Sequence, residues 1–186
     1  MTERNSKKEV KSVYKRGAEY GLWFGIYLTV MSLAIMHGMS HSVLLLLSIA
    51  MLAAIPAIIY QIMRRYRASM LGFASFSSLW MLGVMTFLFG SLICGMVTYV
   101  WMQYVMPTFI YDQVVTAIEL YKTIPGDEAA EMVKVMQTIV DRHALPSPFD
   151  VVVQMIMLVT FLGSLVSMAL AALLGMRRIP PKTPVG

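Results

Sequence analysis

The chain has 186 residues, of which 58% are hydrophobic and 13% charged, and its formal net charge is +5. An average soluble domain is nearer half apolar and about a quarter charged. The apolar residues here fall in unbroken runs of membrane-spanning length, which excludes an ordinary soluble domain. The basic residues lie beside those runs, and this placement indicates topology signals and lipid head groups as partners, with no nucleic acid.

Four apolar runs are each long enough to cross the hydrocarbon core, which takes about 20 residues for about 30 Å. The sequence therefore predicts an all-α membrane protein, with one four-helix transmembrane domain over residues 17–176. Residues 68–78 are either a short interfacial helix or the start of span three. The predicted spans are about 17–37, 42–63, 79–104 and 151–176, flanked by a basic tail at 1–16 and a second tail at 177–186.

Residues 1–16 are too polar and basic for a cleavable signal peptide, and the apolar run that follows is long enough to remain as an anchor. Between spans three and four, residues 105–150 form the one sizeable water-exposed segment. Apolar residues at near-helical spacing predict two amphipathic helices there, at 110–123 and 127–143.

Twelve of the 15 Lys and Arg residues lie in the two tails and in the link after span two. The segment 105–150 has three, Lys122, Lys134 and Arg142, against seven acids. The positive-inside rule then places both termini in the cytoplasm, as in a protein of the inner-membrane type, and residues 105–150 on the opposite side of the membrane.

Small residues recur at every fourth position in two spans. This spacing places each set on one helical face, where small side chains let helix backbones approach. We expect these residues to pack helices within the bundle, or to dock another membrane protein or a second copy of the chain. The predicted helix-packing residues are Gly17, Gly21, Gly25 and Thr29 in span one, and Gly163, Ser167, Ala171 and Gly175 in span four.

A basic cluster forms at the predicted cytoplasmic face once the spans assemble. Each cation near an anionic leaflet contributes about 1 kcal/mol of attraction. The cluster is therefore a candidate contact for anionic lipid or for a partner, although the same charges could serve only to fix orientation. Its members are Lys15, Arg16, Arg64, Arg65, Arg67, Arg177 and Arg178.

The sequence offers little chemistry for catalysis. Apart from Glu19, the cores of the predicted spans hold no acid or base, and such residues usually mark transport or proton relay. His37 and His41 are four apart, but Gly38 and Ser40 between them indicate a turn, and His143 lies among acids. The lone Cys94 makes no metal motif. We expect no metal, no cofactor and no enzymatic activity.

The sequence resembles a family of bacterial membrane proteins, domain-of-unknown-function family 4199. The resemblance extends from about Tyr14 to Met176. The segments that resemble the family are Lys15-Arg16-Gly17 before span one, the basic cluster at 64–67, the Gly72–Phe76 segment and the acidic outer hairpin. The family has no established activity and lends no site residues. The resemblance implies an accessory role beside a polyprenyl-phosphate family-2 glycosyltransferase in envelope glycan assembly.

Three functions stay open at this point. The first is a non-enzymatic accessory or docking subunit for a membrane-bound partner. The second is a small transporter or lipid-handling protein, which needs a polar cavity between spans. The third is an enzyme acting on lipid at the outer interface through the histidines and acids. The residues that could line a polar cavity are Thr29, Ser32, Ser48, Thr86, Ser91, Thr98, Thr160 and Ser164.

Overall fold

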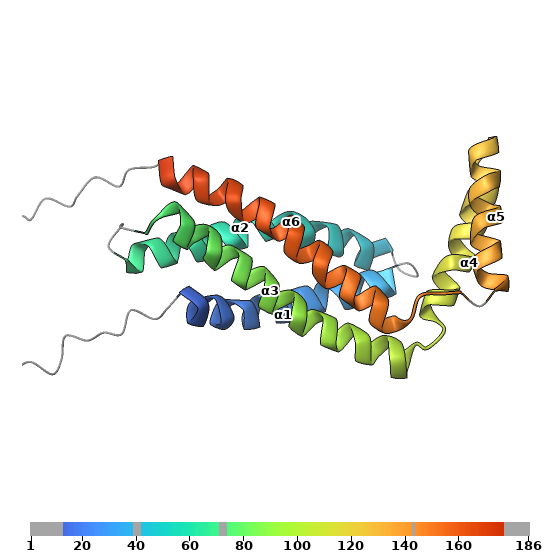
Figure 1. Cartoon of the computed structure of the whole chain (residues 1–186), viewed down its shortest axis with the longest axis horizontal. Coiled ribbons are helices and arrows are strands. Elements are labelled where there is room, and N and C mark those ends of the chain that lie inside the picture. Colours follow the sequence, from blue (N-terminus) through green and yellow to red (C-terminus); the bar gives the residue numbers. More distant parts are fainter. Residues whose placement is uncertain (1–12, 39–41, 71–73, 143, 177–186) are drawn as a thin grey trace, which may run out of the picture. The chain divides into compact units, whose positions relative to one another are not determined.

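The computed structural model describes residues 13–38, 42–70, 74–142 and 144–176, and within these ranges it is helical without a strand. The predicted all-α membrane fold is confirmed. Figure 1 shows α1, α2, α3 and α6 running side by side as long rods. The helices are α1 (Val13–Gly38), α2 (Ser42–Ser69), α3 (Phe76–Val100), η1 (Trp101–Val105), α4 (Phe109–Lys122), α5 (Asp127–Asp141) and α6 (Pro148–Met176).

Four of the described helices are long and apolar enough to cross a membrane. These are α1, α2, α3 together with η1, and α6. The helix count therefore matches the four spans predicted from the sequence. The chain divides into two compact units, one made of residues 1–94 and 156–186, and the other of residues 95–155.

Two of the long helices begin earlier than their apolar runs. Ser147 and Asp150 form a reciprocal cap, in which the Ser147 hydroxyl donates to Asp150 Oδ2 (2.7 Å) and the Asp150 N–H donates to Ser147 Oγ (3.2 Å). Pro148 then occupies the first helical position, where a missing N–H costs nothing. Ser75 caps α3 in a similar way, because its Oγ accepts from the Ser78 N–H (3.2 Å). Span four thus starts at 148 instead of 151, and span three at 76 instead of 79.

The basic residues after span two are part of the helix. α2 continues through Arg64, Arg65 and Arg67 to Ser69, whose hydroxyl donates to the Tyr66 carbonyl (2.6 Å). Arginine is a good helix former, so nothing in this segment stops the helix at Met63. Residues 68 and 69 therefore end α2, while residues 76–78 open α3, and residues 71–73 lie outside the described part.

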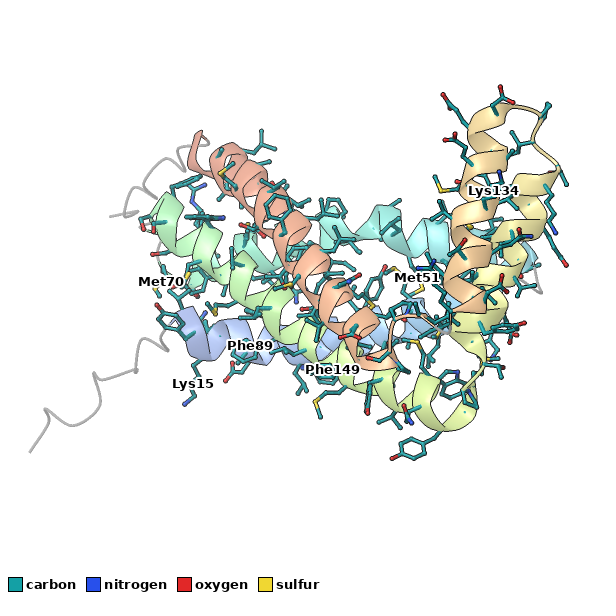
Figure 2. All side chains as sticks on the ribbon, turned by 45° about the vertical axis from the view of Figure 1, so that its right-hand side comes forward. Lys15, Met51, Met70, Phe89, Lys134 and Phe149 are labelled. Carbon is teal, nitrogen blue, oxygen red and sulfur yellow. The ribbon has the colours of Figure 1, made fainter. Side chains whose placement is uncertain are left out.

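The second unit contains a short helical hairpin. α3 ends in a π-helical turn at Trp101–Val105, just before Met106 and Pro107. α4 and α5 are amphipathic and pack against each other, and Ile118 of α4 and Ala129 of α5 are buried. Gly126 between them has φ of +140°, a backbone conformation that glycine adopts without strain. Figure 2 shows the side chains of this hairpin, with Lys134 on α5. Two amphipathic helices were predicted here, and the structure has them within a few residues of the expected bounds.

Glycines on α1 bring that helix close to α3. A Cβ added at Gly21 would lie 2.6 Å from the Cβ of Phe89, and one added at Gly25 would lie 2.9 Å from the Cβ of Ile93. A Cβ added at Gly17 would likewise lie 2.5 Å from the Cβ of Met85. Real Cβ atoms do not approach so closely, so this face of α1 accepts no side chain without movement.

α6 approaches α3 through a second set of small residues. A Cβ at Gly163 would lie 2.2 Å from the Phe87 ring, and one at Gly83 would lie 2.3 Å from Ser167 Oγ. Ser167 and Ala171 are fully buried. The small residues of α1 and α6 thus both face α3.

Two members of the predicted sets behave differently. Gly175 is exposed, and a Cβ there would meet nothing within 4 Å among the described residues. Among the described residues, the packing face of α6 therefore ends at Ala171 and Leu174, and Gly175 lies outside it. Thr29 is half-buried, and its hydroxyl donates to the Gly25 carbonyl of its own helix (2.8 Å).

Gly21→Ala should lower the melting temperature of the purified protein in detergent, because the new methyl group would collide with Phe89. Overpacking of this kind costs about 1–3 kcal/mol. Gly175→Ala is the matched control, since the same methyl group would meet open space and should leave the melting temperature unchanged or raise it. Equal shifts in the two variants would show that α1 and α3 do not approach as closely as the structure has them.

Candidate functional site

The basic cluster gathers at one end of the bundle, where α1 begins and where α2 and α6 end. Two contacts establish this arrangement, one from Arg16 to Ser69 and one from Arg67 to Leu174. Among the described residues, the first unit has five Lys or Arg side chains and one carboxylate, Glu19. This end is therefore strongly positive. We call it the basic end, and its described cations are Lys15, Arg16, Arg64, Arg65 and Arg67.

Arg16 joins α1 to α2. Its Nη1 donates to Ser69 Oγ (2.6 Å), and its Cζ lies 5.4 Å from the centre of the Tyr66 ring. The ring of Tyr66 is buried, so the guanidinium covers an aromatic side chain that faces the bundle. A cation over an aromatic ring is attracted by the ring quadrupole. Arg16 thus holds two helices together.

Arg67 joins α2 to α6. Its Nη1 donates to the carbonyl oxygen of Leu174, in the last turn of α6. The last four carbonyls of a helix have no partner within the helix, and the negative end of the helix dipole favours a cation there. Arg67 is half-buried and serves as a cap for α6 supplied by another helix.

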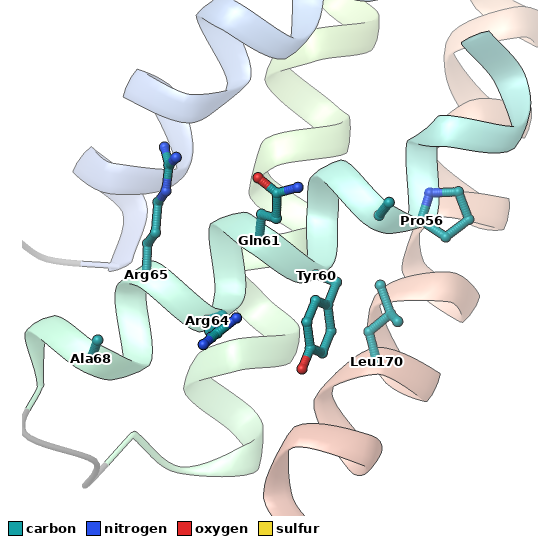
Figure 3. A pocket seen from close by; sticks show the side chains of 8 residues that line it. Pro56, Tyr60, Gln61, Arg64, Arg65, Ala68 and Leu170 are labelled. Atoms are coloured by element: carbon teal, nitrogen blue, oxygen red, sulfur yellow. The ribbon is translucent and has the colours of Figure 1, made fainter. Parts of the chain in front are cut away.

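Arg64 and Arg65 differ from these two arginines. Both are exposed, and among the described residues neither has a hydrogen bond or ion pair. They line a groove of about 710 Å³ on α2, together with Leu170 of α6 (Figure 3). The other lining residues are Pro56, Ala57, Tyr60, Gln61 and Ala68.

The groove is apolar at one end and cationic at the other. Figure 3 shows Tyr60 and Arg64 on the side of α2 that faces Leu170, and Gln61 and Arg65 on the other side. Pro56 lies eight residues before Arg64, which is about 12 Å along a helix. An apolar strip of that length leading to two guanidinium groups is suited to a molecule with a hydrophobic tail and an anionic head.

The spacing of these residues could have revealed the groove in advance. Tyr60 and Arg64 are four apart, as are Gln61 and Arg65, and residues four apart share a helical face. The basic cluster predicted from the sequence included Arg67 with Arg64 and Arg65 and left out Tyr60 and Gln61. The sequence gives no way to separate these arginines in advance, because whether an arginine caps a neighbouring helix or faces outward depends on tertiary contacts.

The remaining cations of the predicted cluster add little to this geometry. Lys15 is exposed and points away from α1 (Figure 2). Arg177 and Arg178 lie outside the described residues. His41 and His143 also lie outside them, and the ring of described His37 is 3.0 Å from the carbonyl oxygen of Leu33 in its own helix. In the described part of the chain, no group of three His, Cys, Asp or Glu residues is placed to hold a metal ion.

The hydroxyls that could line a polar cavity are mostly bonded within the bundle. Each of three donates to the carbonyl four residues earlier at 2.8 Å, namely Thr29, Ser48 and Thr86. Ser91 Oγ donates to the Leu88 carbonyl (3.0 Å) and lies 3.2 Å from Thr160 Oγ1. Ser164 Oγ accepts from the Trp80 indole N–H (3.3 Å). Such bonds are the usual way for Ser and Thr to lie in a membrane helix, and they need no water.

The comparison with known protein families assigns the chain to a family. A family model described as "Protein of unknown function (DUF4199)" matches residues 19–175, which is most of the chain. The chain belongs to this family. The DUF4199 match covers α2 to α5 completely, α1 from Glu19 onward and α6 up to Gly175. The groove and the three arginines of α2 therefore lie within the family domain, whereas Lys15 and Arg16 precede it. No curated protein and no solved structure matches the chain.

Arg67→Gln should destabilise the purified protein by about 1–3 kcal/mol, because the Leu174 carbonyl loses a charged donor. Arg64→Gln removes the same charge from the next turn of the same helix and should change stability by less than about 0.5 kcal/mol, as surface substitutions do. Thermal unfolding of both variants in one detergent tests the difference. An equal effect would mean that Arg67 does not cap α6.

Proposed function

We propose that this DUF4199 protein is a non-enzymatic, multi-pass protein of the bacterial inner membrane that docks a membrane-bound partner. Both termini lie in the cytoplasm in this proposal. The family match and the four apolar helices support a membrane protein. The accessory role is our inference from the surface of the bundle, and a membrane-bound glycosyltransferase is the partner class to test first.

The observation that carries the proposal is the uneven burial of the four long helices. Half of the most apolar window of α3 is buried inside the bundle, against 11% for α2 and 17% for α6. α2 and α6 therefore direct most of their apolar surface away from this chain. Their outward side chains include Leu46, Leu52, Met157 and Phe161, each more than half exposed. Lipid tails or an apolar partner helix can cover such a surface, and a second copy of the chain is one such partner.

The bonded hydroxyls of the bundle support docking over transport. A transporter needs polar groups that face a water-filled path, and broken helices often build its site. Here the Ser48 and Thr86 hydroxyls bond to carbonyls of their own helices, and α2 continues past Pro56 as one helix. A neutral hydroxyl whose hydrogen bond is made within its own helix can pack against neighbouring helices and does not need to face water.

Charge supports the proposed orientation. The described cations of the first unit gather at the basic end, whereas residues 95–155 have three Lys or Arg and seven acids. Segments rich in Lys and Arg stay in the cytoplasm. Four spans then place both termini on that side and the α4–α5 hairpin on the other.

A second candidate function is lipid handling, and the groove with Arg64 and Arg65 favours it. Docking and lipid binding are compatible, because a bound lipid can be part of the surface that a partner meets.

Cysteine labelling tests the orientation. In a Cys94→Ser background, Ala130→Cys on α5 should react with a membrane-impermeant maleimide in intact spheroplasts. Ser6→Cys should react only after the membrane is opened. The reverse pattern would invert the topology and contradict the proposal.

Photocrosslinking tests the docking surface. We expect p-azidophenylalanine at exposed Phe161 to give a discrete adduct with a second membrane protein, or with another copy of the chain, in native membranes. The matched control is the same substitution at Phe87, which is 4% exposed and should give none. If position 161 yields only lipid adducts, the face contacts the bilayer and the docking proposal fails.

A further inference from the structure

We propose that the groove formed by α2 and Leu170 is a specific site for one acidic phospholipid from the cytoplasmic leaflet. The phosphate would lie beside the guanidinium group of Arg64, with Arg65 flanking the groove from the other side of α2, and an acyl chain would follow the strip from Tyr60 to Pro56. The inference rests on the proposed insertion and orientation of the bundle, and it names the ligand of the basic end.

Charge complementarity carries the first step. Arg64 and Arg65 are exposed cations without a protein partner among the described residues, in a unit whose described residues include only one carboxylate. Arg16 and Arg67 are committed to Ser69 and Leu174. Two of the four arginines therefore hold helices together, and the other two can contact a ligand.

Position along the helix carries the second step. Arg64 and Arg65 lie one to two turns before the end of α2 at Ser69, where a spanning helix passes from hydrocarbon to head groups. Arginine side chains at this depth reach toward the interface. The guanidinium group matches the oxygens of a phosphate with two parallel hydrogen bonds, which an ammonium group does not do. An acidic lipid phosphate is the anion present at this level of the membrane.

The apolar part of the groove carries the third step. Pro56 and Ala57 on α2 and Leu170 on α6 line it on the hydrocarbon side of the arginines. Ala57 and Ala68 are small, so the helix surface is hollowed between the larger side chains of Tyr60, Gln61 and the arginines. Tyr60 lies between the apolar strip and Arg64, at the boundary where a lipid changes from tail to head. The groove therefore accommodates a chain as well as a phosphate.

Titration of the delipidated full-length protein with dioleoyl phosphatidylglycerol, followed by native mass spectrometry, tests the site. We expect a one-to-one complex that dioleoyl phosphatidylcholine forms at least about tenfold more weakly. The double variant Arg64→Gln/Arg65→Gln should weaken the complex about 30-fold, from the loss of two cation contacts at an anionic surface. The matched control, Lys122→Gln/Lys134→Gln, removes the same charge from the α4–α5 hairpin and should leave the affinity within about twofold.

Two further variants distinguish a specific phosphate site from non-specific electrostatic attraction of acidic lipids. Arg64→Lys/Arg65→Lys keeps the charge and loses the paired hydrogen bonds, so a phosphate site should weaken about threefold or more. Ala57→Phe fills the groove and should also weaken binding, whereas Ala50→Phe, on an exposed part of α2 outside the groove, should not. Unchanged binding in the Lys or Ala57→Phe variant, or in the Gln double variant, would overturn the site.

Glycerol 1-phosphate distinguishes a lipid from a free phosphate. At millimolar concentration it should not displace the lipid, because it lacks the chain that the groove holds, and displacement would reassign the site to soluble phosphate. Repeating the Phe161 crosslink in the Gln double variant separates this inference from the docking proposal. If the protein binds lipid normally but gives no protein adduct, the docking proposal is contradicted and the lipid site stands. If it gives the adduct but shows no selective lipid binding, the lipid site is contradicted and the docking proposal stands.

Discussion

The close approach of other helices to α3 is the constraint on which the rest of the bundle depends. Within a bilayer, the hydrophobic effect does not favour one apolar helix contact over a contact with lipid, so association relies on van der Waals packing. Packing requires near contact of backbones, and glycine permits it. A Cβ at Gly90 of α3 would lie 3.4 Å from the backbone nitrogen of Gly25 and 2.8 Å from the ring of Phe24. Gly83 and Gly163 play the corresponding part between α3 and α6.

This mode of packing determines what remains on the surface. Small residues occupy the contact faces, so many large apolar side chains of α2 and α6 point away from the bundle. An apolar surface of this extent would be unfavourable in water. Phe24 and Phe87 are exceptions, because they fill the space beside the glycines and meet edge to face with ring centres 5.0 Å apart. The outward faces then need lipid or a partner, and the docking proposal follows from that need.

The sequence was sufficient to predict the four long helices because the length of an apolar run can be read directly along the chain. Runs of apolar residues predicted the four long helices, and the Pro125-Gly126 pair predicted the break between α4 and α5. The helix ends needed capping signals that the prediction overlooked, such as Ser147 with Asp150. Spacing alone placed Gly21 and Gly25 on one face, but it also grouped Gly175 with the packing residues of α6, and Gly175 makes no such contact among the described residues. Periodicity does not tell where a neighbouring helix ends.

The candidate site was less accessible to sequence reasoning, because three arginines within four residues have different surroundings. Arg67 faces α6 and caps it, while Arg64 and Arg65, three and two positions earlier, face outward. A turn of 100° per residue is enough to produce this difference. The basic end therefore combines two roles that composition cannot separate. Arg16 and Arg67 fix the positions of α1 and α6 relative to α2, and that fixed geometry gives the groove beside Arg64 and Arg65 a defined shape. A charge that served only to orient the chain would need no such arrangement, since any exposed cation on the cytoplasmic side suffices for orientation.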